Sequence, residues 1–195
     1  MSVRRMLRLA AVLLAVAGAA GCAAALDVRY PESGVNPALL TSIAPRRVVI
    51  GPVSDRRLDR ARIGLRPSSQ EAIVTRRPVE EIVREALGAE LGRNGHSVVG
   101  DVGDVVLAAE VEEFWLDAAR RRSVTQYVGR VAIALVVVDA RSGSRLLTRR
   151  YVGIRRVLGD ADAEQVWREV MDTALARTMH DMATDPDLVA ALSPR

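Results

Sequence analysis

The sequence is poor in the residues that most metal sites, disulfides and nucleic-acid interfaces need. It contains one cysteine, two histidines, no lysine and only three per cent aromatic residues in 195 residues. One cysteine cannot form an intramolecular disulfide, and few aromatic residues are left for stacking on bases. His96 and His180 have no second histidine or cysteine at ligand spacing. We therefore expect no metal site and expect both histidines at the surface.

The first residues have the order of a secretory signal. Three arginines come first: Arg4, Arg5 and Arg8. Residues 9–20 are then all apolar or glycine, a run too short for a transmembrane helix, which needs about 20 apolar residues. Small residues lead directly into Cys22. This order predicts a signal peptide over residues 1–21.

The sequence around Cys22 resembles the lipobox of bacterial lipoproteins, with Ala19 where leucine is usual. The resemblance implies a diacylglyceryl group and an N-acyl chain such as palmitate on Cys22, and no other cofactor. An ordinary secretory signal with an incidental Cys22 is the alternative. Ala23 is not the aspartate that retains many lipoproteins at the inner membrane. We expect the outer membrane, with the domain facing the periplasm; the periplasmic face of the inner membrane is the alternative.

The positive net charge does not indicate a nucleic-acid partner. The formal charge is +4, and removal of the three arginines of the signal leaves +1. The absence of lysine is typical of a GC-rich genome and does not indicate selection for phosphate contacts. We therefore expect no binding to nucleic acid.

Two helices are predicted from apolar residues at helical spacing. One begins at Pro78 and ends at Asn94-Gly95, and the other covers residues 163–182, with Asp160 or Asp162 as its cap. A small helix is expected from Pro186 to Leu192.

Strands are predicted before and between the two helices. The two early strands are Arg47–Val53 and Ser69–Thr75, and His96–Val99 leads into the sheet. A meander of three strands follows: Val105–Leu116, Val124–Asp139 and Ser144–Leu158, with a charged turn at Asp117–Arg122. Residues 22–45 contain prolines without a period, which predicts a lipidated tether before a single domain at 46–195. The order predicts an α+β two-layer sandwich: a mixed or mostly antiparallel sheet with both helices on one face.

Several short segments resemble the YajG-like lipoproteins of Gram-negative bacteria. They are Val53-Ser54-Asp55-Arg56-Arg57, Ile63-Gly64, Asn94-Gly95-His96, and Asp181-Met182 followed by Asp185. The resemblance implies an outer-membrane lipoprotein without assigned enzymatic activity. The overall plan is also similar, by analogy, to the auxiliary lipoproteins of lipid and lipopolysaccharide transport.

No group of residues predicts a catalytic site. Glu110 and Glu112 lie two residues apart on one strand and could mimic a glycosidase pair, but a solvated strand face is the simpler interpretation. An enzyme that acts on the cell wall is the least favoured hypothesis. We therefore predict a protein that is not an enzyme.

Two groups of residues are candidates for binding. The first is an arginine-rich loop that could bind anions or a partner: Asp55, Arg56, Arg57, Arg60, Arg62 and Arg66. An ordinary solvated loop, with Asp55 and Asp59 paired locally, is the favoured alternative. The second is the aromatic group Phe114, Trp115 and Tyr127, for which packing is favoured over a partner surface.

The sequence leaves two hypotheses about the ligand. A membrane-anchored accessory or scaffold would bind another envelope component, above all a protein, through the free face or an edge of the sheet. The alternative is an auxiliary lipoprotein of lipid transport that contacts phospholipid or lipopolysaccharide directly.

Overall fold

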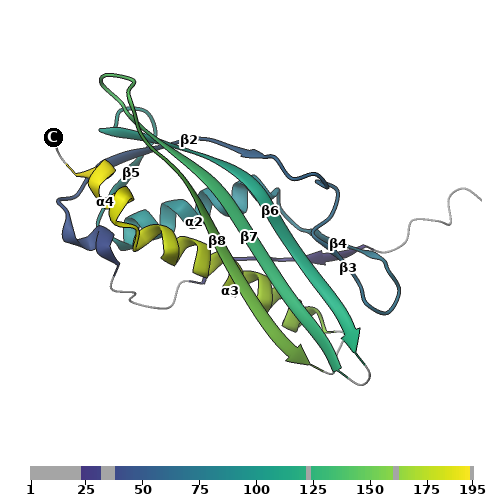
Figure 1. Cartoon of the computed structure of the whole chain (residues 1–195). Coiled ribbons are helices and arrows are strands. Elements are labelled where there is room, and N and C mark those ends of the chain that lie inside the picture. The colour runs from purple at the N-terminus through teal and green to yellow at the C-terminus, as the bar shows by residue number, and fades with distance from the viewer. Residues whose placement is uncertain (1–22, 32–37, 122–123, 160–162, 194–195) are drawn as a thin grey trace, which may run out of the picture.

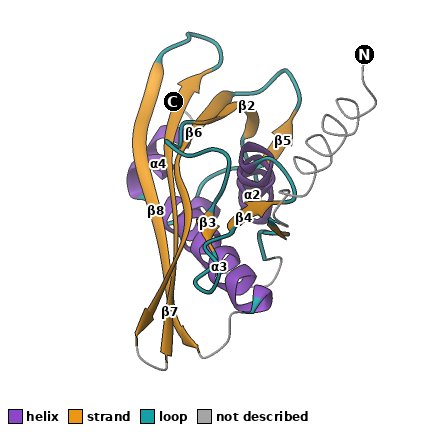
Figure 2. Cartoon of the chain, turned by 90° about the vertical axis from the view of Figure 1, so that its right-hand side faces the viewer, coloured by secondary structure: helices purple, strands orange, loops and turns teal. Residues whose placement is uncertain are grey.

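The computed structural model describes residues 23–31, 38–121, 124–159 and 163–193, which form a mixed eight-stranded sheet with helices on one face. Figures 1 and 2 show the helices on one side of the long, twisted strands. This arrangement confirms the predicted α+β two-layer fold. The signal peptide, Cys22 and the proposed helix caps Asp160 and Asp162 lie outside the described residues.

Three long strands make the antiparallel meander, in which β8 is an edge strand of the sheet: β6 (Val105–Arg121), β7 (Val124–Asp139) and β8 (Arg145–Gly159). The other edge of β6 is shared by two strands that both run parallel to it, β2 (Arg47–Asp55) and β3 (Gly64–Leu65). Three short strands lie outside these: β5 (Ser97–Val99), β4 (Ala72–Thr75) and β1 (Ala24–Leu26). β5 pairs with β2, while β4 pairs with β3 and β1 pairs with β4.

Two helices cover the same face of this sheet. α2 (Val79–Arg93) packs mainly on β2, and α3 (Glu164–Ala183) packs on β7 and β8. A short α4 (Pro186–Leu192) is capped by Asp185, whose side chain accepts a hydrogen bond from the Asp187 N–H. A 3-10 turn, η1 (Leu39–Ser42), lies beside this helix. The backbone of α3 comes close enough to β8 that a Cβ on Gly153 would lie 2.0 Å from the carbonyl oxygen of Ala174.

The predicted charged turn at Asp117–Arg122 is wrong, because β6 continues through Arg121. Each residue from Asp117 to Arg121 has a partner on β7, ending with Arg121 opposite Val124. The polar side chains of this stretch suggested a turn, but pairing with a long neighbouring strand keeps the backbone extended.

The predicted tether is also wrong in its described part. β1 is a strand of the sheet, and the side chains of Leu26, Val28 and Leu40 are fully buried. Ala24, Leu26 and Val28 alternate with polar or half-exposed neighbours, so one side of this short extended segment fills the core. Three residues are too few to show this period convincingly in the sequence.

His96 is not a surface residue. Its side chain is 4% exposed, and its Nδ1 accepts a hydrogen bond from the backbone N–H of Arg46 at 3.1 Å. Burial lowers the pKa of His96 below its ordinary value. His180 is exposed, as predicted.

Candidate functional site

No helix among the described residues covers the sheet face opposite α2 and α3 (Figure 2). This face carries apolar side chains. The half-buried apolar residues of this open face are Val106, Ala108, Ala134, Val136, Val138 and Val152. They come from three neighbouring strands and alternate with the fully buried residues under the helices. The open face therefore carries an apolar strip beside charged residues.

A β-bulge interrupts this strip where the carboxylates lie. The register of β6 against β7 shifts between Val111 and Glu113, so that Glu112 is an extra residue. Each carboxylate has an arginine partner: Glu110 with Arg56 at 3.3 Å, Glu112 with Arg150 at 2.6 Å, and Glu113 with Arg130 at 3.8 Å. The carboxylates considered for catalysis are therefore held in ion pairs.

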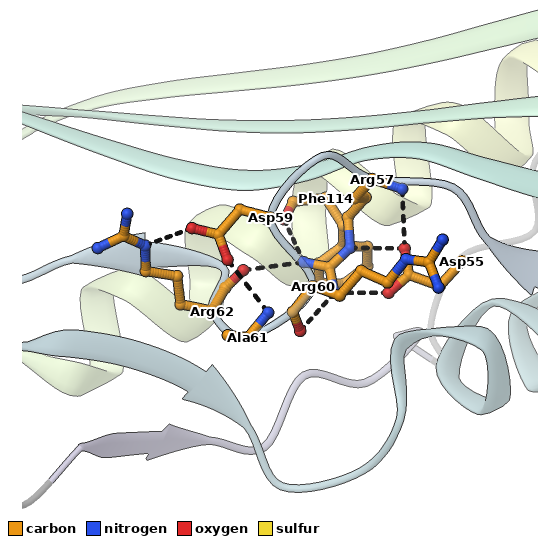
Figure 3. Close-up of polar contacts among 7 residues, drawn as sticks. All are labelled: Asp55, Arg57, Asp59, Arg60, Ala61, Arg62 and Phe114. Carbon is orange, nitrogen blue, oxygen red and sulfur yellow. Dashed lines mark hydrogen bonds and ion pairs between the residues drawn. The ribbon is translucent and has the colours of Figure 1, made fainter.

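Arg57 organises the loop that follows β2 (Figure 3). Its side chain is 7% exposed, and its Nε and Nη2 bind the two carboxylate oxygens of Asp55 at 3.0 and 2.8 Å. The same guanidinium donates to the backbone carbonyls of Arg60, Arg62 and Phe114. Burial tends to raise the pKa of Asp55, but the hydrogen bonds from Arg57 outweigh this effect and hold the pKa below its ordinary value. Arg57 is thus committed to shaping the loop.

The other arginines of the predicted binding loop do not converge on one point. Arg56 pairs with Glu110, Arg62 pairs with Asp59 at 2.6 Å, and Arg66 lies 3.8 Å from Glu71 and over the Trp167 ring. Within the described residues, Arg60 is the member of this set without an ion pair. The ion pairs Arg57–Asp55 and Arg62–Asp59 are the local pairs that we expected for a solvated loop.

A pocket of about 360 Å³ lies between this loop and the bulge of β6. Leu58, at the tip of the loop, is fully exposed on one side of it, and Trp115 is half-buried on the other. The Trp115 Nε1 donates to Asp117 at 2.8 Å, and the Arg62 guanidinium lies 6.0 Å from the centre of the indole ring. Glu112 and Arg150 also line the pocket, which therefore offers apolar surface beside an ion pair.

The predicted aromatic group is divided between the two faces of the sheet. Phe114 and Tyr127 are fully buried under the helices, as the packing interpretation predicts, whereas Trp115 lines the pocket on the open face. Leu58 was missed by the sequence reasoning. Its signal is a lone leucine within the charged run Arg56–Arg62.

The comparisons with known proteins give a fold and no sequence family. No family model matches the sequence, and no curated protein matches it. The solved structure of protein XCC0632 from Xanthomonas campestris, of the DUF330 family, is similar with a TM-score of 0.59 at 15% identity, covering 87% of this chain and 97% of that one. This likeness shows that the two chains share a fold.

Two further solved structures are described as lipoproteins and are similar at lower scores. A putative lipoprotein from Caulobacter crescentus has a TM-score of 0.41 at 17% identity, over 71% of this chain and 87% of its own. Lipoprotein GNA1162 from Neisseria meningitidis has a TM-score of 0.36 at 15% identity, over 57% and 84%. The YajG-like resemblance has no family match behind it and stays a prediction.

The described residues hold no group of three or more histidine, cysteine or acidic side chains placed to bind a metal ion. No helix among them is long and apolar enough to cross a membrane.

Proposed function

We propose that this chain is a lipid-anchored envelope lipoprotein that binds another envelope protein through the open face of its sheet, as an accessory or scaffold and without catalysis. The anchor is the acylated Cys22, and the outer membrane is the proposed site. The observation that carries the binding proposal is the pocket beside the open apolar strip that is lined by both exposed Leu58 and half-buried Trp115.

The chemistry of this pocket fits a protein partner. Tryptophan and arginine are enriched where interfaces contribute most binding energy, and a ring of charged groups commonly surrounds such a centre. Here Trp115 is flanked by Arg62 and by the Glu112–Arg150 ion pair. Because Arg57 fixes the loop from beneath, Leu58 is presented without a large entropic cost on binding.

The same geometry argues against catalysis at this surface. A carboxylate that acts as a general acid or base needs a pKa near the working pH and must be able to reach the substrate. Glu110, Glu112 and Glu113 instead each contact an arginine.

The test is native mass spectrometry of the acylated protein, extracted from its own membranes in mild detergent. We expect the acyl mass on Cys22 and a protein-sized increment. Leu58→Asp and Trp115→Ala should each weaken that complex at least about tenfold, equivalent to about 1.4 kcal/mol, because both remove a central apolar contact. The matched control is Val102→Asp, which changes a residue that is 62% exposed outside the open strip and should leave the complex intact.

The outcomes separate the parts of the proposal. A protein complex that survives both pocket variants would move the interface elsewhere. Lipid-sized increments that disappear in Leu58→Asp would support the auxiliary role in lipid transport, which the apolar pocket beside Arg150 also fits. A polypeptide without acyl mass would contradict the anchor.

A further inference from the structure

The segment directly after Cys22 is fixed to the domain, not free. β1 begins at Ala24, only two residues after Cys22, and pairs with β4. The Arg76 N–H donates to the Leu26 carbonyl at 3.0 Å, and the Arg29 N–H donates to Asp172 at 2.8 Å. Further along, Arg93 donates to the Pro31 carbonyl at 3.1 Å and lies over the Tyr30 ring. The start of the mature chain is thus part of the folded body.

This attachment limits how far the domain can stand from a lipid anchor. Two residues span at most about 7 Å, even when fully extended. The headgroup layer on each side of a bilayer is about 5–7 Å thick. Ala24 therefore lies within or directly above the headgroups if Cys22 carries the lipid.

The strand directions decide which end of the domain lies there. β3 runs parallel to β6, β4 runs antiparallel to β3, and β1 runs parallel to β4. β1 consequently runs opposite to β6 and begins toward the end where β6 finishes, which is also the end where β8 finishes (Figure 1). We call this the anchor end of the sheet.

Leu158 lies farther toward the anchor end than the start of β1. The register places Ala24 level with Ile73, Gly64 and Leu116 in turn. Leu158 pairs with Gln126, and Gln126 pairs with Ala119. Ala119 is three residues beyond Leu116 on β6, so Leu158 lies about 10 Å farther along the strands than Ala24 does. This distance is comparable to the whole reach of the chain from Ala24 to Cys22.

The side chains at the anchor end suit a lipid surface. Leu158 is 71% exposed, although it is a large apolar residue. Arg120 and Arg156 are both exposed, and neither forms an ion pair with any residue that the structure describes. Arginine binds phosphate oxygens through two parallel hydrogen bonds, and an exposed leucine beside it can enter the boundary between headgroups and acyl chains.

We propose that the anchor end of the sheet lies on the bilayer, with Arg120 and Arg156 at lipid phosphates and Leu158 in the interface. This inference rests on the proposed anchor at Cys22. It names a second surface, distinct from the Leu58–Trp115 pocket, and commits to an anionic phospholipid headgroup as its partner.

The test uses the acylated full chain in vesicles of phosphatidylethanolamine and phosphatidylglycerol that contain a nitroxide-labelled lipid. Acylation blocks the thiol of Cys22, the only natural cysteine, so a fluorophore reacts only with an introduced Leu158→Cys. The matched control is Val102→Cys, which is 62% exposed just before β6 begins, about 45 Å from Leu158 along the strands. We expect the nitroxide to quench the fluorophore at position 158 and to leave the fluorophore at position 102 unquenched. Equal quenching at the two positions, or none at 158, would overturn the proposal.

A second variant tests whether the anchor end itself binds the membrane or is only held there by the short chain between Cys22 and Ala24. About 20 Gly/Ser residues inserted between Ala23 and Ala24 would extend the reach to roughly 25 Å. Quenching at position 158 should persist in this variant and be lost when Arg120→Ala and Arg156→Ala are added. The control pair Arg141→Ala and Arg145→Ala, at the opposite end of β8, should retain it. Loss on insertion alone would contradict headgroup binding by this surface.

The mass of the same sample distinguishes the two proposals. Without an acyl mass on Cys22 the proposed anchor fails. With the acyl mass present and position 158 unquenched, only the orientation on the membrane fails.

Discussion

The two faces of β7 differ although the strand is apolar along most of its length. The covered face carries Val131, Ile133, Leu135 and Val137, all fully buried under the helices. The open face carries Ala134, Val136 and Val138, which are shielded only partly. Because the core is already complete on one side, the apolar residues of the other side are not needed for it. Their presence supports the proposal that this face binds a partner.

The two faces also differ in how tightly they are packed. Under α3 the sheet carries Gly129 and Gly153, where a Cβ would meet helix atoms at less than 3 Å. The open face carries Arg130 and Arg150, which extend across the sheet to carboxylates on β6. A substitution on the covered face should therefore disturb the fold, whereas one on the open face should mainly disturb recognition.

The largest expected effect tests the covered face. Gly153→Ala should lower the free energy of unfolding by about 4 kcal/mol, above the usual range for one added methyl group, because the Ala174 carbonyl and the Thr178 hydroxyl oxygen would have to move. Urea denaturation measures the loss. Gly92→Ala is the control, since nothing lies within 4 Å of its Cβ and alanine favours the helix. If Gly153→Ala were as stable as the wild type, the close contact of α3 with β8 would be wrong.

The next effect compares two neighbouring arginines of the loop. Arg57→Ala should cost about 3 kcal/mol, because it leaves the half-buried Asp55 carboxylate without its guanidinium partner and removes the donor to the Phe114 carbonyl. Arg56→Ala should cost less than about 0.5 kcal/mol, since its ion pair with Glu110 is exposed. Thermal unfolding of both variants provides the comparison. Similar losses for the two would contradict the role of Arg57 as the residue that shapes the loop.

The smallest effect concerns the contact between α3 and the amino-terminal segment. Burial raises the pKa of Asp172 to about 6, although the Arg29 N–H opposes this effect. The folded protein therefore binds a proton more readily than the unfolded chain, and this group lowers stability as pH rises from about 4 to 6. Asp172→Asn should remove that slope and raise stability at pH 7 by about 1 kcal/mol, measured by urea denaturation across this pH range.

Asp27→Asn provides a control in which the change in the slope of stability against pH has the opposite sign. A hydrogen bond from Arg29 lowers the pKa of Asp27, so its contribution to stability is lost as pH falls, and the variant should remove a slope that rises with pH. If Asp172→Asn left the pH dependence unchanged, Asp172 would not be desolvated by the contact between α3 and residues 27–31.

The sequence alone predicted the elements whose patterns are long. α2 and α3 keep helical spacing over several turns, and β7 is a run of β-branched residues, so their positions were predicted closely. The same reasoning failed where the pattern is short or polar. β1 has three residues, and the last part of β6 carries charged side chains on a backbone that its partner strand keeps extended.

For the candidate site, the sequence predicted some of the residues but not the contacts between them. The sequence identified the arginine-rich loop and Trp115, but it could not say which arginines would be engaged. Arg57 is committed because its guanidinium reaches carbonyls of its own loop and of β6, a contact across 57 residues of sequence. The residues next to the two partners, Leu58 and Trp115, line the same pocket.

The sequence by itself determined the class of fold, and it predicts a lipid attachment signal at Cys22, because periodicity and the order of a signal peptide are local properties of the chain. Only the tertiary structure decided that β1 belongs to the sheet, that the bulge at Glu112 opens a pocket, and that Leu158 lies at the anchor end. These features depend on pairing between strands that are distant in sequence, and no local pattern encodes which distant strand will be the partner.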